Sequence, residues 1–135
     1  MCRLGLTKDS VPYIVPVSFA YADNALYFHT ALAGMKVDFI EEQNRACFEF
    51  ELDVKPLIQG DIACDWGFSF QSVIGHGVIS ELTGYRDKAD GLKRIIQQYV
   101  EGEWPMTDRQ IAGTRVWKLE IESMTGKQSE DHFCS

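Results

Sequence analysis

Bulky apolar residues alternate with smaller ones through the segment 11–21, and this two-residue period predicts a β-strand. The bulky set is Val11, Tyr13, Val15, Val17, Phe19 and Tyr21. One face of this strand is expected in the core, while the other leaves room for a flat ligand. Asp23 and Asn24 favour a tight turn, after which the segment 26–30 is expected to return as an antiparallel strand.

The predicted return strand ends in polar residues and leads into a short helix. His29 and Thr30 close the strand, and Gly34 and Lys36 fall at the start of a helix predicted over 33–42. A lysine in the first turn of a helix opposes the helix dipole, so it costs a little stability. Free backbone N–H groups and a cation at such a helix start can hold an anion. We therefore expect an anion site here.

The remaining pattern predicts further strands and two more helices. Strands are expected over 1–7, 45–52 and 115–124, and a long strand over 68–82 should be broken or bulged at Gly75 and Gly77. Asp87 is the expected N-cap of a helix that ends near Val100, and Thr107 with Gln110 forms a capping box. The segment 53–66 is expected to be a loop with some extended structure. About six strands without βαβ alternation favour a largely antiparallel barrel with flanking helices.

Composition favours one soluble globular domain. The chain has 135 residues, of which 45% are hydrophobic and 24% are charged. Its apolar runs are shorter than the roughly 20 residues that a membrane helix needs. The beginning of the chain shows no charged and then apolar targeting pattern. We therefore expect a cytoplasmic protein without a membrane segment.

The charge and the cysteines exclude several classes of function. A net charge of −7 argues against nucleic-acid binding, which needs a basic surface. Cys2, Cys47, Cys64 and Cys134 are widely spaced and form no CxxC pair. They are expected to be reduced thiols, and the sequence contains no metal-ligand cluster or phosphate-binding GxxxxGK motif.

Five segments together resemble a known family. They are Arg3-Leu4-Gly5, the strand 12–19, the run 27–31 with Gly34 and Lys36, the run 72–75, and Thr125-Gly126-Lys127. In order and spacing they are similar to the FMN-binding split-barrel family, which includes pyridoxamine-phosphate oxidases. The resemblance is stronger to its branch of nitroimidazole-resistance or flavin-nucleotide-binding proteins.

The resemblance implies a mainly β fold with flanking helices, an antiparallel six-stranded split β-barrel of the FMN-binding type. Residues 1–135 would form a single domain, and the tail after about residue 127 is expected to be loosely ordered. Relatives usually carry an additional helix before the Arg3-Leu4-Gly5 strand, so we expect the chain to be a short member or to start later than its relatives.

The resemblance also implies a set of flavin-binding residues. Lys36 and Thr30 would contact the phosphate, strand residues around Pro16 would line the ring, and His29 would lie close to the flavin as a candidate catalytic group. Arg3 and Arg45 are candidate second cations. The expected cofactor-binding set is Val15, Pro16, Val17, Ser18, Phe28, His29, Thr30, Gly34, Lys36, Gln71, Ser72 and Val73, with no metal ligands.

Three departures from the oxidase pattern bear on the substrate. Met35 stands where the oxidases have an arginine before the phosphate lysine, and Ser72 stands where they have a flavin-contacting glutamine. The late Arg-x-His pattern of the oxidases is also absent. These differences weaken the expected phosphate clamp and argue against oxidation of vitamin B6.

The resemblance implies a homodimer that holds FMN at its interface. The expected function is flavin-dependent reduction of nitroaromatic or similar small electrophiles, with a reduced nicotinamide, NAD(P)H, as the electron donor. Two alternatives remain open at this point: a flavin carrier or sensor without turnover, and a haem-binding split barrel with His29 or His76 as ligand. FAD is an alternative to FMN.

Overall fold

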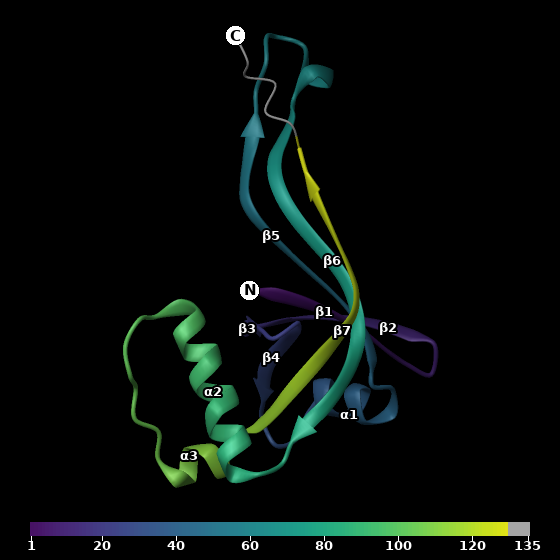
Figure 1. The fold of residues 1–135 in the computed structure, drawn as a ribbon. Coiled ribbons are helices and arrows are strands. Elements are labelled where there is room, and N and C mark those ends of the chain that lie inside the picture. Colours follow the sequence, from purple (N-terminus) through teal and green to yellow (C-terminus); the bar gives the residue numbers. More distant parts are fainter. Residues whose placement is uncertain (130–135) are drawn as a thin grey trace.

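A computed structural model describes residues 1–129 of the chain (Figure 1). It contains seven antiparallel strands, three α-helices and one short 3-10 helix. The strands are β1 (Cys2–Lys8), β2 (Val11–Val17), β3 (Phe19–Ala22), β4 (Ala25–Thr30), β5 (Arg45–Leu57), β6 (Gly67–Leu82) and β7 (Arg115–Gln128). The helices are α1 (Met35–Glu42), η1 (Ala63–Asp65), α2 (Tyr85–Tyr99) and α3 (Asp108–Ala112).

The order of the strands explains why the sheet curls. The strands lie in the order β2-β1-β5-β6-β7-β4-β3, so β2 and β3 form the two opposite edges. Only Ser18 separates β2 from β3 in the chain. The two edges must therefore meet at Ser18, which closes one corner of a barrel that stays open elsewhere. This is a split barrel, as predicted.

The prediction of six strands was wrong by one. The expected continuous strand over 11–21 is divided at Ser18, and β3 then pairs with β4 instead of continuing β2. The predicted turn is confirmed, because Asp23 and Asn24 have φ angles of 52° and 57°. Both values suit the tight two-residue turn of a β-hairpin.

The barrel interior holds the main core. Phe28, Phe48, Leu4 and Leu119 are each at most 1% exposed and pack with Trp117. The alternation along β2 is confirmed at Val15 and Val17, which are buried with this core. Val37 and Ile40 bury the inner face of α1 against it.

Helix α2 covers the outer face of β3 and β4. Its Ile95 packs against Ala20 and Tyr27 in a second, smaller core. The end of α2 also satisfies the edge strand, since the backbone N–H of Phe19 donates to the Tyr99 hydroxyl at 3.0 Å. The helix starts three residues earlier than expected. The prediction of Asp87 as N-cap was wrong, because Gly84 caps the helix and Asp87 lies in its first turn.

The predicted irregularity in the long strand β6 is confirmed. The register between β6 and β7 shifts between His76 and Gly77. A side chain at Gly77 would overlap the backbone of Glu120 on β7, so the shift needs a glycine there. The capping box of Thr107 and Gln110 at the start of α3 is also present.

Strands β5, β6 and β7 extend beyond the barrel as an arm, which we define as residues 52–74 and 124–128 (Figure 1). The segment 53–66, predicted as a loop with some extended structure, begins with the end of β5, which continues to Leu57 after a register shift between Leu52 and Lys55. Order also extends past residue 127: Ser129 exchanges hydrogen bonds with the backbone of Phe70. The rest of the predicted loose tail lies outside the described residues.

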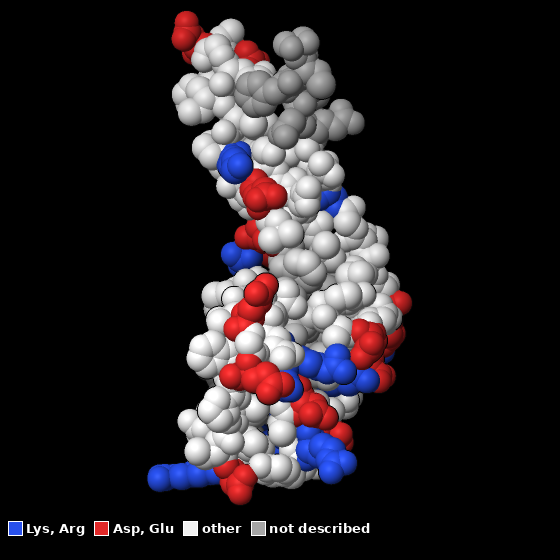
Figure 2. All heavy atoms as spheres, turned by 60° about the vertical axis from the view of Figure 1, so that its left-hand side comes forward, with Lys and Arg blue, Asp and Glu red and all other residues white. Residues whose placement is uncertain are grey.

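The arm exposes many apolar side chains. Leu52 and Phe68 are 61% and 59% exposed, and Val54, Ile58, Ile62, Trp66 and Ile74 are similarly open. Figure 2 shows few charged side chains on the upper part of the molecule, whereas Lys, Arg, Asp and Glu cluster over its lower body. Exposed apolar side chains in such number usually pack against another protein surface.

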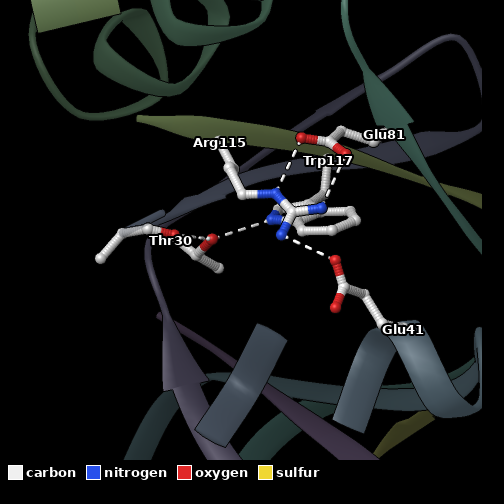
Figure 3. A network of polar contacts seen from close by, with 6 residues as sticks. Thr30, Glu41, Glu81, Arg115 and Trp117 are labelled. Carbon is white, nitrogen blue, oxygen red and sulfur yellow. Dashed lines mark hydrogen bonds and ion pairs between the residues drawn. The ribbon is translucent and has the colours of Figure 1, made fainter. Parts of the chain in front are cut away.

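A polar network lies at the end of the barrel near α1 (Figure 3). Arg115 forms two 2.8 Å hydrogen bonds to the carboxylate of Glu81 and a third to Glu41 on α1. Its guanidinium stacks on the Trp117 ring, 4.6 Å from the centroid. The carboxyl pKa of Glu81 is held below its usual value mainly by the hydrogen bonds from Arg115. The network therefore ties β6, β7 and α1 together.

Within residues 1–129, no helix is long and apolar enough to cross a membrane.

Candidate functional site

The Ser18 corner and the end of β4 lie side by side. Phe19 pairs with Phe28, so the same register carried one residue further places Ser18 beside His29. Pro16 and Ser18 are exposed on the outer face of the sheet, beyond the part that α2 covers. Because Pro16 has no N–H to donate, its place on the edge strand β2 costs no ladder hydrogen bond.

The start of α1 offers unpaired backbone donors. Gly34 caps the helix with a φ of 139°, a conformation that favours glycine, and among residues 1–129 no side-chain hydrogen bond caps this helix start. Lys36, in this first turn, is half-buried, and no ion pair of Lys36 is found within residues 1–129. Three N–H groups, the helix dipole and one cation therefore converge at this end.

The electrostatics place His29 close to Lys36. The pKa of His29 is lowered from its usual value, first by partial burial of the ring and then by the positive charge of Lys36. Neutral imidazole therefore predominates at pH 7. The structure thus brings together four of the predicted site residues: Ser18, His29, Gly34 and Lys36.

Thr30 has surroundings that the sequence did not indicate. Its side chain is 4% exposed, its hydroxyl donates to the Ala31 carbonyl at 2.8 Å, and it accepts from the indole N–H of Trp117 at 3.0 Å (Figure 3). The Thr30 proton is therefore already used within the chain. Phe28, Val15 and Val17 likewise point into the core, so only their backbone atoms can face a ligand.

The segment 71–73 lies far along β6 from the register of His29, which pairs with Val116 and through it with Leu82. Ser72 pairs with Glu51 and Lys127 on the arm side of β6, and Gln71 and Val73 point to the opposite face of the strand. Gln71 lines a hollow of about 460 Å³ in the arm, together with Lys55, Phe70 and Gln128. The ladder therefore separates Gln71, Ser72 and Val73 from His29 along β6, although Val73 packs against the same core as Phe19.

The other predicted cations are engaged elsewhere. Arg3 pairs with Glu49 and Glu51, and Arg45 pairs with Glu122 at 3.0 Å. Neither cation is aimed at α1. Tyr99 is a residue that sequence analysis missed at this corner: its hydroxyl accepts a hydrogen bond from the backbone N–H of Phe19, next to Ser18.

The model of one protein family matches residues 1–128 of the chain, and that family is described as pyridoxamine 5'-phosphate oxidase. The chain belongs to this family. No curated protein matches the chain.

Several solved structures share the fold. A candidate 5-nitroimidazole antibiotic resistance protein from Bacteroides thetaiotaomicron is 27% identical with a TM-score of 0.82, and the match covers 93% of this chain and 74% of that one. The flavocytochrome Anf3 from Azotobacter vinelandii is 24% identical with a TM-score of 0.81, covering 96% and 61%. The FAD and haem binding protein from Mycobacterium smegmatis is 17% identical with a TM-score of 0.83, covering 96% and 65%. The chain therefore spans less than two thirds of the length of the last two.

The geometry of the site suits a phosphate-bearing ligand. The uncapped start of α1 and Lys36 provide an anion site, and the exposed surface at Pro16 and Ser18 adjoins it. Metal ligation has no comparable support, because residues 1–129 contain no group of three or more His, Cys, Asp or Glu side chains that could hold an ion.

Proposed function

We propose that the chain binds FMN as a homodimer and acts as a flavin-dependent reductase of nitroaromatic or similar small electrophiles. The observation that carries this proposal is the cluster at the uncapped start of α1, where half-buried Lys36 adjoins His29 and the Ser18 corner. A dianionic phosphate would receive N–H donors and a cation here in an otherwise acidic chain. Its membership of a family with flavin-binding neighbours supports the same cofactor class.

The placement of the segment 71–73 supports the homodimer. This segment is separated from His29 along the β4–β7–β6 ladder, so a flavin that touches both would be accommodated between two copies. The apolar arm gives a second reason, since Leu52 and Phe68 would be covered by a partner.

A bound flavin would supply hydride and electron transfer chemistry. The chain would hold the phosphate through the N–H groups of α1 and Lys36, and would orient the ring along the exposed backbone at Pro16 and Ser18. His29 is mostly neutral at pH 7, so it can offer one N–H to a ligand but is a weak proton donor. Protons for reduction of a nitro group would then come mainly from water.

The proposal is tested first by the absorbance spectrum of the purified protein and then by stopped-flow mixing with FMN added. We expect a flavin spectrum that bleaches with NADH or NADPH and recovers on addition of a nitroimidazole. Activity should survive in His29→Ala, at a rate lowered by roughly ten-fold or less, because His29 is not the main acid.

Other outcomes would identify the alternatives. A bound flavin that neither nicotinamide bleaches would contradict the reductase and favour a carrier or sensor. A haem spectrum in place of a flavin spectrum would overturn the cofactor, and retention of that spectrum in His29→Ala would exclude His29 as its ligand. If the protein binds FAD and not FMN, the proposed cofactor would be corrected from FMN to FAD.

A further inference from the structure

A second hollow lies on the outward face of the sheet formed by β2, β1, β5 and β6. Its volume is about 420 Å³, within the range of small-molecule sites. The residues that shape it are Gly5, Pro12, Ile14, Arg45, Cys47 and His76. The hollow is separate from the candidate flavin site described above, since none of Ser18, His29, Gly34 and Lys36 lines it.

The sulfur of Cys47 lies at the floor of this hollow. A methyl group on Gly5 of the neighbouring strand would overlap the Cys47 Sγ, so the sulfur occupies the space that this glycine leaves open. Cys47 is a free, exposed thiol. By contrast, Cys2 is fully buried, and this burial raises its pKa to about 11.

His76 is the direct cross-strand neighbour of Cys47. The two residues pair in the β5–β6 ladder, and both line the hollow. Directly opposed residues on one face of an antiparallel pair have Cβ atoms roughly 5 Å apart, within reach of a hydrogen bond between thiol and imidazole. An imidazole in this position can accept the thiol proton as the sulfur attacks.

Arg45 gives the hollow a cationic rim. It is two residues from Cys47 on the same face of β5, and its ion pair with Glu122 is exposed on both sides. An exposed pair of this kind contributes little and can be exchanged for a ligand carboxylate. Pro12 and Ile14 form the apolar wall on β2, while Glu49 and Glu122 are the acidic groups nearest on β5 and β7.

We propose that Cys47 is a site of reversible S-thiolation by a small, carboxylate-bearing disulfide. The Cys47 thiol passes its proton to His76, and the thiolate attacks the nearer sulfur of the disulfide. The disulfide bond of the ligand breaks as the new bond to Cys47 forms. The departing thiolate takes the proton from His76 and leaves as a thiol, so the exchange needs no other oxidant. Arg45 binds a carboxylate of the half that stays attached.

The test compares two forms of the full chain by mass spectrometry. One form, Cys64→Ser with Cys134→Ser, keeps Cys47, and the other, Cys47→Ser with Cys134→Ser, keeps Cys64, an exposed thiol on the arm. Both are mixed with glutathione disulfide, which bears carboxylates, or with cystamine, which bears amines. We expect glutathione disulfide to modify Cys47 at least ten-fold faster than Cys64. Cystamine should also modify Cys47 faster than Cys64, because His76 assists both reagents, but this preference should be smaller because Arg45 assists only the carboxylate-bearing disulfide.

Two surface variants test the roles assigned to Arg45 and His76 in the reaction of Cys47. Arg45→Gln should remove the preference of Cys47 for glutathione disulfide over cystamine, and His76→Gln should slow both reagents at Cys47 by about ten-fold. A circular dichroism spectrum confirms that each variant is folded. Equal rates at Cys47 and Cys64, or rates at Cys47 that neither variant changes, would overturn the proposal. It does not depend on the flavin function, since no flavin is needed for the reaction.

Discussion

At the scale of single residues, Lys36 and Thr30 lie near the same end of the barrel but have different roles in the structure. The Thr30 hydroxyl is buried between Trp117 and the Ala31 carbonyl, so it stabilises the fold. Lys36 lies beside unpaired N–H groups at the start of α1 and opposes the helix dipole. When a residue lowers helix stability and no contact in the fold offsets this loss, a bound ligand is a physical reason for its presence.

Lys36→Ala should therefore weaken FMN binding. Loss of one charge-assisted hydrogen bond to a phosphate costs roughly 1.5–3 kcal/mol, which corresponds to a ten- to hundred-fold higher Kd. Fluorescence titration of the flavin measures this change. Lys93→Ala is the matched control, since Lys93 lies on α2 and pairs with Glu103. An unchanged Kd in Lys36→Ala would refute the phosphate assignment.

The same variant has a second readout that needs no flavin. Lys36 is one of two causes that lower the pKa of His29, so Lys36→Ala should raise that pKa while partial burial still holds it below its usual value. NMR titration of the His29 ring measures the shift. In the parent protein, the lowered pKa contributes stability above pH 6.5, the usual value, and this contribution is lost as the pH falls through the folded-state pKa.

At the scale of elements, α2 protects an edge of the sheet. Strand β3 is an edge strand, and the Phe19 and Tyr21 N–H groups donate to Tyr99 and Gln98 at the end of α2. These side-chain acceptors replace the missing neighbouring strand. They also fix the backbone that follows Ser18, the corner next to the candidate flavin site.

Tyr99→Phe should lower the free energy of unfolding by about 1 kcal/mol, because the Phe19 N–H loses its acceptor while the ring is kept. Urea unfolding followed by circular dichroism measures this loss. Tyr85→Phe is a suitable comparison, since the hydroxyl of Tyr85 donates to exposed Asp108 on α3 and not to the sheet. An equal loss of unfolding free energy in the two variants would show that the hydrogen bond to the Phe19 N–H contributes no more than an exposed one.

The sequence predicted those elements whose signals are local. The Asp23-Asn24 turn, the Thr107 capping box and the glycine irregularity in β6 depend on neighbouring residues, and each is present. The division of the strand at Ser18 has no local signal, because the period of two continues through it. It arises only when the two sheet edges meet.

The candidate site was predictable to a similar extent. Gly34 and Lys36 were found because a helix start carries its own chemistry. The hydrogen bonds of Thr30 to Trp117 and of Tyr99 to Phe19 join residues that are 87 and 80 positions apart, so spacing could not show them. Nor could the sequence place the segment 71–73 away from His29, since that depends on how far β6 runs before it reaches the barrel.

At the scale of the whole molecule, the arm is the part of the described chain whose apolar side chains are most often exposed. Strands β5, β6 and β7 pair with one another along it, but within residues 1–129 the outer edges of β5 and β7 in the arm have no neighbouring strand. Its apolar side chains are not covered. This combination suits a rigid projection that packs against a second copy.

We expect the protein to sediment as a dimer at low micromolar concentration. The double substitution Leu52→Asp with Phe68→Asp should shift it toward a monomer, because burial of two carboxylates in an apolar interface is unfavourable. Val100→Asp, a change at an exposed apolar residue at the end of α2, is the control and should leave the dimer intact. A stable, folded monomer of the parent chain would contradict the proposed assembly.

The meeting of both sheet edges at Ser18 also limits how the chain can change in length. One residue inserted there would turn β3 over, so that the bulky ring of Phe19 would face α2 and the small side chain of Ala20 would face the barrel interior. The arm tip at 58–66 and the connection 100–107 have no such constraint, because a longer loop there leaves every strand in register. Evolutionary insertions in this fold should therefore accumulate at those two places and be excluded from the corner.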